Sequence, residues 1–230
     1  MLIELHPSNI FKKHIAFIVF LLITNSLGIV SKLFLEDDYF YGFVPLFDMN
    51  AEANIPTLFS SVMMLVCSCM LYLIAKHHRK ENLSFIPWYG LSLIFLFLAI
   101  DETYSIHESF SESIHVTYET SGFFYYAWVI PYAVVVLIFL SIYAKFLLSL
   151  PKKIMLLFMF SGFVFVSGAI GFEMLGGQEA ESYGNQTLVY SIYFTCEETL
   201  EMLGIAIFLY TILLYIVSHM ISLTIKISDK

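Results

Sequence analysis

Charged residues are scarce in this sequence. Asp, Glu, Lys and Arg make up only 13% of its 230 residues, whereas soluble proteins average about a quarter. Hydrophobic residues make up 59%, and the mean hydropathy is +0.82. No stretch between the apolar runs is long enough for a soluble domain. We therefore expect residues 1–230 to form a single integral-membrane domain, with membrane lipid and not nucleic acid as its partner.

Three kinds of membrane protein are excluded by residues that the chain does not have. It lacks the many clustered histidines of membrane desaturases and hydroxylases. It lacks the His-x-x-x-His pair near the C-terminus that the ceramidase and progestin-receptor group of zinc hydrolases uses, and the lysine near the middle of a span that retinal proteins need. Cys67 and Cys69 lie in one apolar run and Cys196 stands alone, so no disulfide framework is predicted.

Six apolar runs are long enough to cross a bilayer, because about 20 helical residues span a hydrocarbon core roughly 30 Å thick. We place the spans near residues 14–35, 57–75, 86–104, 122–147, 153–175 and 189–217. Pro56, Pro87 and Pro151 stand at or just before helix starts, where the missing N–H costs least. Gly176 and Gly177 predict the end of the fifth span. The expected fold class is all-α, an integral membrane bundle of six transmembrane helices.

The basic residues mark one side of this bundle. Ten of the eleven lie before the first span, between the second and third, between the fourth and fifth, or after the sixth. The positive-inside rule assigns that side to the cytoplasm, so we expect both termini to be cytoplasmic. Lys32 is the exception, at the outer end of the first span, and we expect its side chain to extend outward to water.

Sixteen of the nineteen acidic residues fall on the opposite, outer side, where Lys32 is the one basic residue. Two stretches concentrate acids at helix ends. Residues 99–115, AIDETYSIHESFSESIH, carry acids and two histidines out of the third span, and residues 196–204, CEETLEMLG, place three glutamates at the start of an apolar run. Carboxylates in such positions are costly in a membrane, which makes both stretches candidates for a functional site.

A continuous third helix predicts a ladder of polar side chains. At about 100° per residue, five residues then share one face. They are Asp101, Ser105, Glu108, Glu112 and His115. Glu112 and His115 also form the Glu-x-x-His step of carboxylate-bridged di-iron proteins. Glu102 and His107 point away from this face, so their participation depends on where the helix breaks.

The sixth span predicts a second group of carboxylates. Glu201 follows Glu197 by four residues and Glu198 by three, so the three side chains can reach a common neighbour. The tetrapeptide Glu-Met-Leu-Gly occurs at residues 173–176 and again at residues 201–204. This repeat hints at two similar helix ends that face one site.

The negative charge of the outer carboxylates must be neutralised or balanced, and no arginine lies on the outer side to do so. Protonation of some carboxyl groups, a cationic substrate or a bound metal would each do so. Mixed carboxylate and imidazole ligands suit Zn, Fe or Mn, and we favour a divalent metal. The expected metal ligands are Asp101, His107, Glu108, Glu198, Glu201, Glu52, Glu112 and His115. Glu102 and Glu197 are the expected catalytic residues, as general bases.

Three segments also carry a resemblance to a known family. They are FDMNAEANIPTLFSS at residues 47–61, LAIDETYSIHE at residues 98–108 and CEETLEMLG at residues 196–204. They resemble a family of uncharacterised bacterial multi-pass proteins with Asn-Ile-Pro-Thr, Asp-Glu-x4-His-Glu and Glu-Glu-x2-Glu motifs. The resemblance implies a location in the inner (plasma) membrane and names no substrate. It also implies one functional set: Glu52, Asp101, Glu102, His107, Glu108, Glu197, Glu198 and Glu201.

Three classes of function fit these residues. The first is a membrane-embedded metalloenzyme, either a metal-dependent hydrolase or a di-iron oxidoreductase, that acts on a lipid or lipid-like substrate in the outer leaflet. The second is a proton or divalent-cation transporter, although the inner halves of the helices offer few titratable groups. The third is a non-catalytic sensor or assembly subunit with an acidic outer face. We rank the metalloenzyme first.

Overall fold

The computed structural model describes residues 6–109 and 120–219, and this part of the chain is helical, with no strand. Within these described residues, six helices are long and apolar enough to cross a membrane. They are α1 (Pro7–Phe34), α3 (Ile55–Lys80), α4 (Ile86–Tyr104), α6 (Val129–Ser149), the continuous helix Lys152–Tyr183 and α9 (Leu188–His219). The prediction of an all-α membrane bundle with six spans is confirmed.

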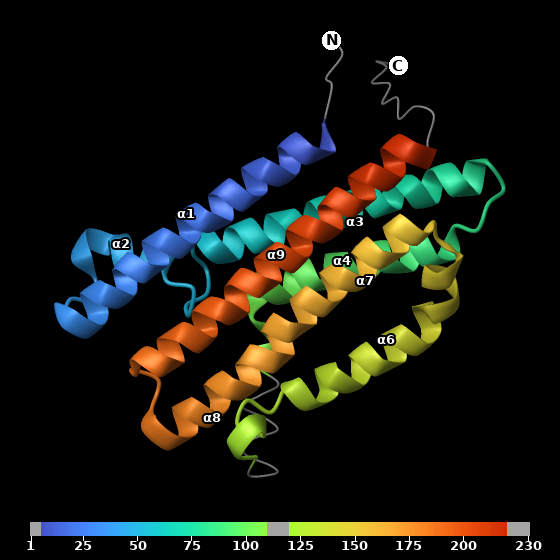
Figure 1. Ribbon diagram of the computed structural model, residues 1–230. Helices are drawn as coiled ribbons and strands as arrows, with labels where there is room; N and C mark the ends of the chain where they lie inside the picture. The colour runs from blue at the N-terminus through green and yellow to red at the C-terminus, as the bar shows by residue number, and fades with distance from the viewer. Residues whose placement is uncertain (1–5, 110–119, 220–230) are drawn as a thin grey trace.

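The six spans run roughly along one direction, and α9 lies at the centre of the bundle. It packs against α1, against α3, and against the helix Lys152–Tyr183, which consists of α7 (Lys152–Val166), the π-helical segment η3 (Ser167–Phe172) and α8 (Glu173–Tyr183). In Figure 1, α6 stands apart from the other spans, and the start of α1 and the end of α9 lie at the same end of the bundle. We call that end the inner end and the opposite end the outer end.

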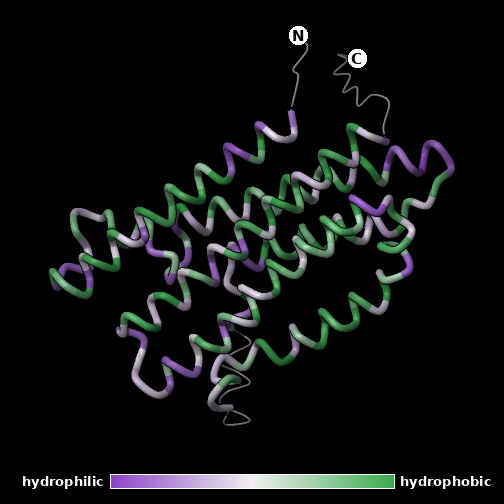
Figure 2. Tube along the Cα trace, viewed as in Figure 1, coloured by the Kyte–Doolittle hydropathy of each residue, from purple (hydrophilic) through white to green (hydrophobic). Residues whose placement is uncertain are grey.

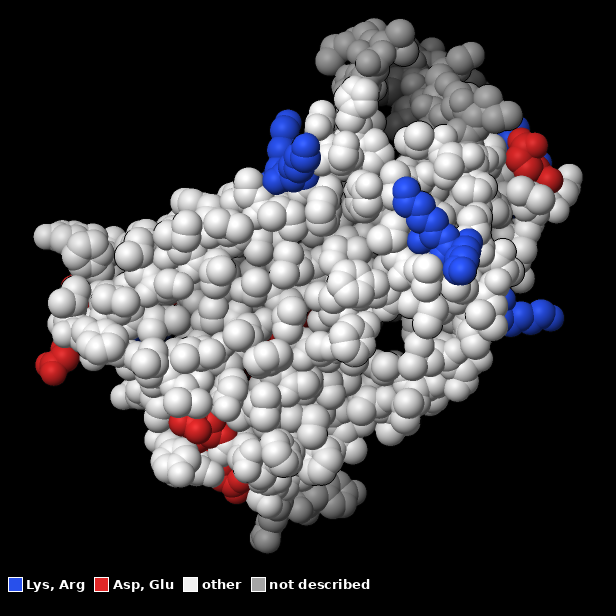
Figure 3. Space-filling model, viewed as in Figure 1, with Lys and Arg blue, Asp and Glu red and all other residues white. Residues whose placement is uncertain are grey.

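The charges are segregated between the two ends. Figure 3 shows the Lys and Arg atoms towards the inner end and most of the visible Asp and Glu atoms at the outer end. Figure 2 shows hydrophobic residues along most of each helix and hydrophilic residues mainly near the turns. Which end faces the cytoplasm stays a prediction from the positive-inside rule.

The predicted helix starts at proline are confirmed. Pro56 and Pro87 lie in the first turns of α3 and α4, and Pro151 is the N-cap residue of α7. The first span is longer than predicted and begins at Pro7. The fourth begins at Val129 and not at residue 122, because the chain first forms a 3-10 turn, η2 (Gly122–Phe124), in which Gly122 has a φ of 61°.

The predicted end of the fifth span at Gly176 and Gly177 is wrong. The helix continues through both glycines to Tyr183. The small size of Gly177 serves packing instead, because a Cβ atom on it would lie 3.0 Å from Cδ2 of Tyr126 and 3.3 Å from Cβ of Tyr125. Gly177 therefore lets the segment before α6 lie directly on α8.

Two other glycines bring α7 and η3 close to α9. A Cβ atom on Gly204 would lie 2.8 Å from the backbone nitrogen and 2.9 Å from the Cα of Phe165. A Cβ atom on Gly168 would lie 2.6 Å from the carbonyl oxygen of Glu197. Small residues of this kind allow close backbone approach between spanning helices. This approach sets the position of Glu197 relative to η3.

We expect Gly204→Ala to destabilise the protein, because the added methyl group would push the backbone of Phe165 away from α9. Overpacking of this kind costs about 1–3 kcal/mol. Thermal unfolding in detergent micelles would measure the loss. Gly162→Ala is the matched control, because a Cβ atom on Gly162 meets nothing within 4 Å. Equal stability of the two variants would contradict the proposed close approach.

Candidate functional site

A pocket lies near the outer end of the bundle, among α3, α4, α6, η3 and α9. Its volume is about 70 Å³, which exceeds the roughly 10–15 Å³ that one water molecule needs. The polar residues that line it are Glu52, Asp101, Glu102, His107, Trp128, Tyr132, Glu197, Glu198 and Glu201. Met64, Leu98, Phe165 and Ala169 complete the lining. Among the residues that the structure describes, neither Lys nor Arg lines this pocket.

The third span ends where Ser105 adopts a left-handed conformation. Its φ and ψ are 48° and 45°, and its backbone N–H donates to the carbonyl oxygen of Asp101. The predicted ladder on one continuous helix face is therefore wrong, because a left-handed residue reverses the direction of the chain. The reversal brings His107 back against the end of α4. Glu102 and His107, which a continuous helix would have separated from the ladder, both line the pocket.

Asp101 is the anchor of this reversed segment. Its side chain is buried, and its Oδ1 accepts the backbone N–H of His107 at 3.0 Å. Its Oδ2 accepts the hydroxyl of Tyr132 at 3.0 Å and lies 3.4 Å from Nδ1 of His107. Asp101 therefore fixes both the backbone and the ring of His107, and it ties α4 to the start of α6.

The pKa of His107 is raised above its ordinary value of 6.5. Burial alone would lower it, but the hydrogen bond to Asp101 and the negative charges of Asp101, Glu108 and Glu52 together outweigh burial. In the metal-free protein, the charged imidazolium is thus stabilised by the carboxylates around it.

Glu52, His107 and Glu108 form the tightest group of possible metal ligands. One ligand atom from each of the three side chains lies within 4.8 Å of the other two. Glu108 is exposed, whereas Glu52 and His107 are half-buried. Burial and then the negative charge of Glu108 raise the pKa of Glu52, against the opposing effects of His107 and of a hydrogen bond from Thr57. The group lies between the pocket and the solvent.

The predicted carboxylate group of the sixth span also faces this pocket. Glu197, Glu198 and Glu201 all line it from α9. Glu198 interacts electrostatically with Glu52, and Glu201 with Glu102. The two acid-bearing stretches, which are almost a hundred residues apart in the sequence, therefore meet at one place.

The sequence prediction missed Glu173, Trp128 and Tyr132. Oε1 of Glu173 accepts the indole N–H of Trp128 at 2.8 Å, and the carboxyl groups of Glu173 and Glu197 lie close to each other. The repeated Glu-Met-Leu-Gly tetrapeptide was the available signal for Glu173. No signal marked the two aromatic residues, because Trp and Tyr are common at membrane interfaces.

Lys32 does not extend freely to water as predicted. Its ammonium group forms an ion pair with Asp48 in the first outer loop, and Asp48 is buried. Lys32 is not among the residues that line the pocket. Lys32 therefore supplies no positive charge to the pocket, and His107 is the lining residue among those described that can carry one.

The structure places eight of the ten predicted site residues together. Asp101, Glu102, His107, Glu52, Glu197, Glu198 and Glu201 line the pocket, and Glu108 joins Glu52 and His107 at its edge. Glu112 and His115 lie outside the described residues. The roles assigned to all ten as metal ligands or catalytic groups stay predictions.

In the metal-free protein, we expect Asp101→Asn to lower the pKa of His107. Burial lowers this pKa, and the variant loses the negative charge of Asp101 that helps to raise it. Charged His107 stabilises the fold at pH values below its ordinary pKa, and this stabilisation is lost as the pH rises through the raised pKa. The variant should therefore also show a weaker decline of stability across that range.

NMR titration of histidine-labelled protein in the presence of a chelator would measure this pKa, with His107→Gln to assign the resonance. Asp48→Asn is the control, because Asp48 pairs with Lys32. An unchanged pKa of His107 in Asp101→Asn would contradict the role given to Asp101.

Comparison with known proteins identifies a family but no activity. No curated protein and no solved structure matches the chain. One family model, described as a domain of unknown function, matches residues 15–216 and so covers all of the residues that line the pocket. The chain belongs to this family, DUF8692.

Proposed function

We propose that the outer pocket binds a divalent metal ion through Glu52, His107 and Glu108, and that the protein is a metal-dependent membrane enzyme. The observation that carries the proposal is the convergence of three ligand atoms within 4.8 Å at a pocket without a lining Lys or Arg among the described residues. One imidazole and two carboxylates suit Zn, Fe or Mn. Three protein ligands also leave positions for water or substrate, as catalytic metal sites require.

The contacts of His107 support this assignment. Its Nδ1 faces Asp101 at 3.4 Å, which leaves Nε2 for a metal. Histidine ligands in metalloproteins commonly have a carboxylate at the other ring nitrogen, which orients the ring and increases its basicity. Asp101 is therefore better placed as the partner of His107 than as a direct ligand.

Further carboxylates extend from the proposed metal site into the pocket. Glu102 and Glu197 line the pocket and are the candidates for a general base that deprotonates water. Glu198 and Glu201 lie in the same lining and offer ligands to a second ion. One ion per chain fits a hydrolase, and two ions fit a di-iron oxidoreductase.

The position of α6 supports a lipid or lipid-like substrate. Only 6% of the residues in the most apolar stretch of α6 are buried inside the protein. At its outer end it is tied to the bundle by Tyr132 and Trp128, and at its inner end by Tyr143, whose hydroxyl donates to the carbonyl oxygen of Pro87 at 3.2 Å. Figure 3 shows an opening beside α6 on the side of the molecule, nearer to the Lys and Arg residues of the inner end than to the visible Asp and Glu residues of the outer end. We propose that acyl chains reach the protein from the membrane along this exposed face of α6.

A transporter is less well supported. In the middle of the bundle, the buried polar side chains of the described residues are hydroxyls such as Ser68, Ser92 and Thr211. The hydroxyl of Ser68 donates to the backbone of Ser92, and that of Thr211 to its own helix. Around them lie Leu71 and Ile212, which are fully buried. A relay of titratable groups across the membrane is not formed by these residues.

Elemental analysis of the purified protein tests the metal site. After loading with Zn²⁺, Mn²⁺ or Fe²⁺ and removal of excess metal, the wild type should retain one or two ions per chain. Glu52→Gln and His107→Ala should each weaken the affinity at least tenfold, on the order of what the loss of an orienting partner alone costs. Asp38→Asn is the control, because Asp38 is an exposed carboxylate of the same loop as Glu52. A wild type that retains none of the three metals would refute the site.

Comparison of membrane lipids tests the enzymatic part. We expect host membranes that contain the wild type to show a lipid product that is absent with Glu102→Gln, while that variant keeps its metal. Loss of a general base slows a reaction by about 10²–10⁴-fold. Mass spectrometry of extracted lipids would measure the product, with Asp38→Asn as the active control. Identical lipids with the wild type and Glu102→Gln, both loaded with metal, would favour a sensor or a transporter.

A further inference from the structure

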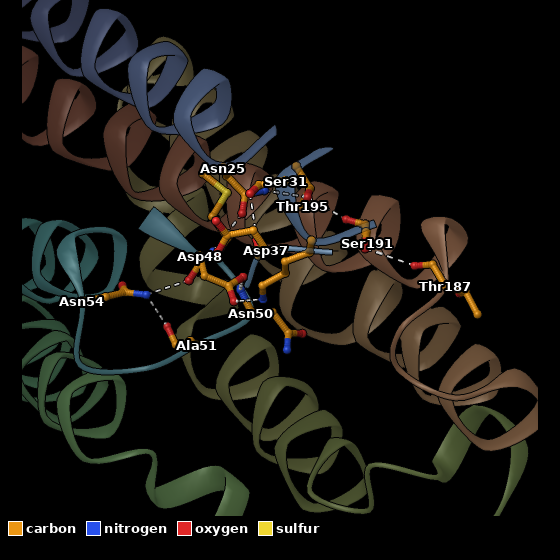
Figure 4. A network of polar contacts seen from close by, with 12 residues as sticks. Asn25, Ser31, Asp37, Asp48, Asn50, Ala51, Asn54, Thr187, Ser191 and Thr195 are labelled. Carbon is orange, nitrogen blue, oxygen red and sulfur yellow. Dashed lines mark hydrogen bonds and ion pairs between the residues drawn. The ribbon is translucent and has the colours of Figure 1, made fainter. Parts of the chain in front are cut away.

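A polar network joins the first outer loop to two of the spans, as Figure 4 shows. At its centre is Asn25 of α1, whose side chain is 1% exposed. Its Oδ1 accepts the backbone N–H of Met49 at 3.0 Å, and its Nδ2 donates to Oγ1 of Thr195 at 2.9 Å. Because the backbone N–H of Met49 can only donate, the side-chain atom of Asn25 that accepts it must be the amide oxygen. Asn25 therefore binds the loop on one side and α9 on the other.

On the loop side, residues 48–54 are held as one turn. Asn54 donates to the carbonyl oxygens of Asp48 and Ala51 at 2.6 and 2.7 Å, and its own Oδ1 accepts the backbone N–H of Thr57 at the start of α3. The ion pair with Lys32 holds Asp48 to α1. This turn, residues 48–54, carries Glu52 into the pocket.

The backbone conformation of Ala53, the residue after Glu52, also depends on these hydrogen bonds. Ala53 has a φ of 58°, in the left-handed region that is unfavourable for a residue with a Cβ atom. Such a conformation persists only where the surrounding structure imposes it. The hydrogen bonds of Met49 and Asn54, on either side of Ala53, impose this conformation. The polar network therefore determines where the backbone places the side chain of Glu52.

On the other side of Asn25, the network reaches the carboxylates of α9. Thr195 lies three residues before Glu198, and its hydroxyl donates to the carbonyl oxygen of Ser191 at 2.6 Å. The single amide of Asn25 thus spans the distance between the turn that carries Glu52 and the helix that carries Glu198. These two glutamates interact electrostatically across the pocket.

We propose that Asn25 is a positioning residue that holds the turn 48–54 against α9 and thereby sets the place of Glu52 in the pocket. The effect on metal binding rests on the proposed function, whereas the effect on the turn does not. A polar residue in a spanning helix is costly unless its polar groups are satisfied. Both polar atoms of Asn25 are satisfied by the two parts of the site that it joins.

Hydrogen–deuterium exchange tests the effect on the turn without any metal. In Asn25→Leu, which keeps the size of the side chain, amides of residues 48–54 should exchange at least tenfold faster, since the bond to Met49 is lost. Thr195→Val should give a smaller increase, because Asn25 still binds Met49. Ser26→Ala is the matched control, as Ser26 is the exposed neighbour and bonds only within α1. Unchanged exchange of residues 48–54 in Asn25→Leu would overturn the proposal.

A double-mutant cycle with Mn²⁺ tests whether Asn25 acts through Glu52. We expect Asn25→Leu to weaken Mn²⁺ binding about tenfold in the wild-type background and to change it little when Glu52→Gln is already present. Equal weakening in both backgrounds would mean that Asn25 supports only general packing, and would overturn the positioning role. If the wild type binds no Mn²⁺, Zn²⁺ or Fe²⁺, the proposed function fails and the exchange measurement alone decides the role of Asn25.

Discussion

The structure depends on the convergence of many carboxyl groups around one pocket that, among the described residues, neither Lys nor Arg lines. Some of these carboxyl groups have hydrogen-bond donors within the protein. Asp101 accepts three hydrogen-bonding contacts from His107 and Tyr132, and Glu173 accepts the indole of Trp128. Glu102, Glu198 and Glu201 are half-buried and line the same pocket. Negative charges that lie this close together repel one another, which is why an ion or a polar substrate group fits this pocket better than a purely structural role.

Local departures from regular helix bring these side chains together. The left-handed Ser105 turns His107 back onto Asp101, and the left-handed Ala53 directs Glu52. The π-helical segment η3 lies between α7 and Glu173, and its Gly168 sits against the carbonyl oxygen of Glu197. Single π-helical turns inside longer helices are frequent at functional sites. Three separate irregularities therefore serve the same pocket, while the rest of each span stays regular.

The sequence predicts the spans well because length and hydropathy alone determine which segments cross a bilayer. It also predicts that Asp101 and Glu198 belong to one site, because unpaired carboxylates are rare in such helices. It does not predict the break at Ser105, since serine has no strong preference for the left-handed region. Gly177 is read wrongly as a helix end because its contact with Tyr126 is tertiary. The first error concerns the backbone conformation of one residue, and the second concerns a contact between distant segments, which local sequence does not encode.

The two ends of the bundle differ in a way that favours an amphiphilic substrate. At the inner end, Trp88 packs on Tyr215 and Phe146 with ring centroids 4.6 and 5.0 Å apart, which closes the space among α4, α6 and α9. At the outer end, Glu108 is exposed, so the proposed metal site is open to water. Figure 3 shows a separate opening beside α6 on the side of the molecule, nearer to the Lys and Arg residues than to the visible Asp and Glu residues of the outer end. A water-soluble substrate would need only the first opening. The proposal of a lipid-like substrate therefore rests on the exposed face of α6, whereas the proposal of a metal ion rests on the carboxylate pocket.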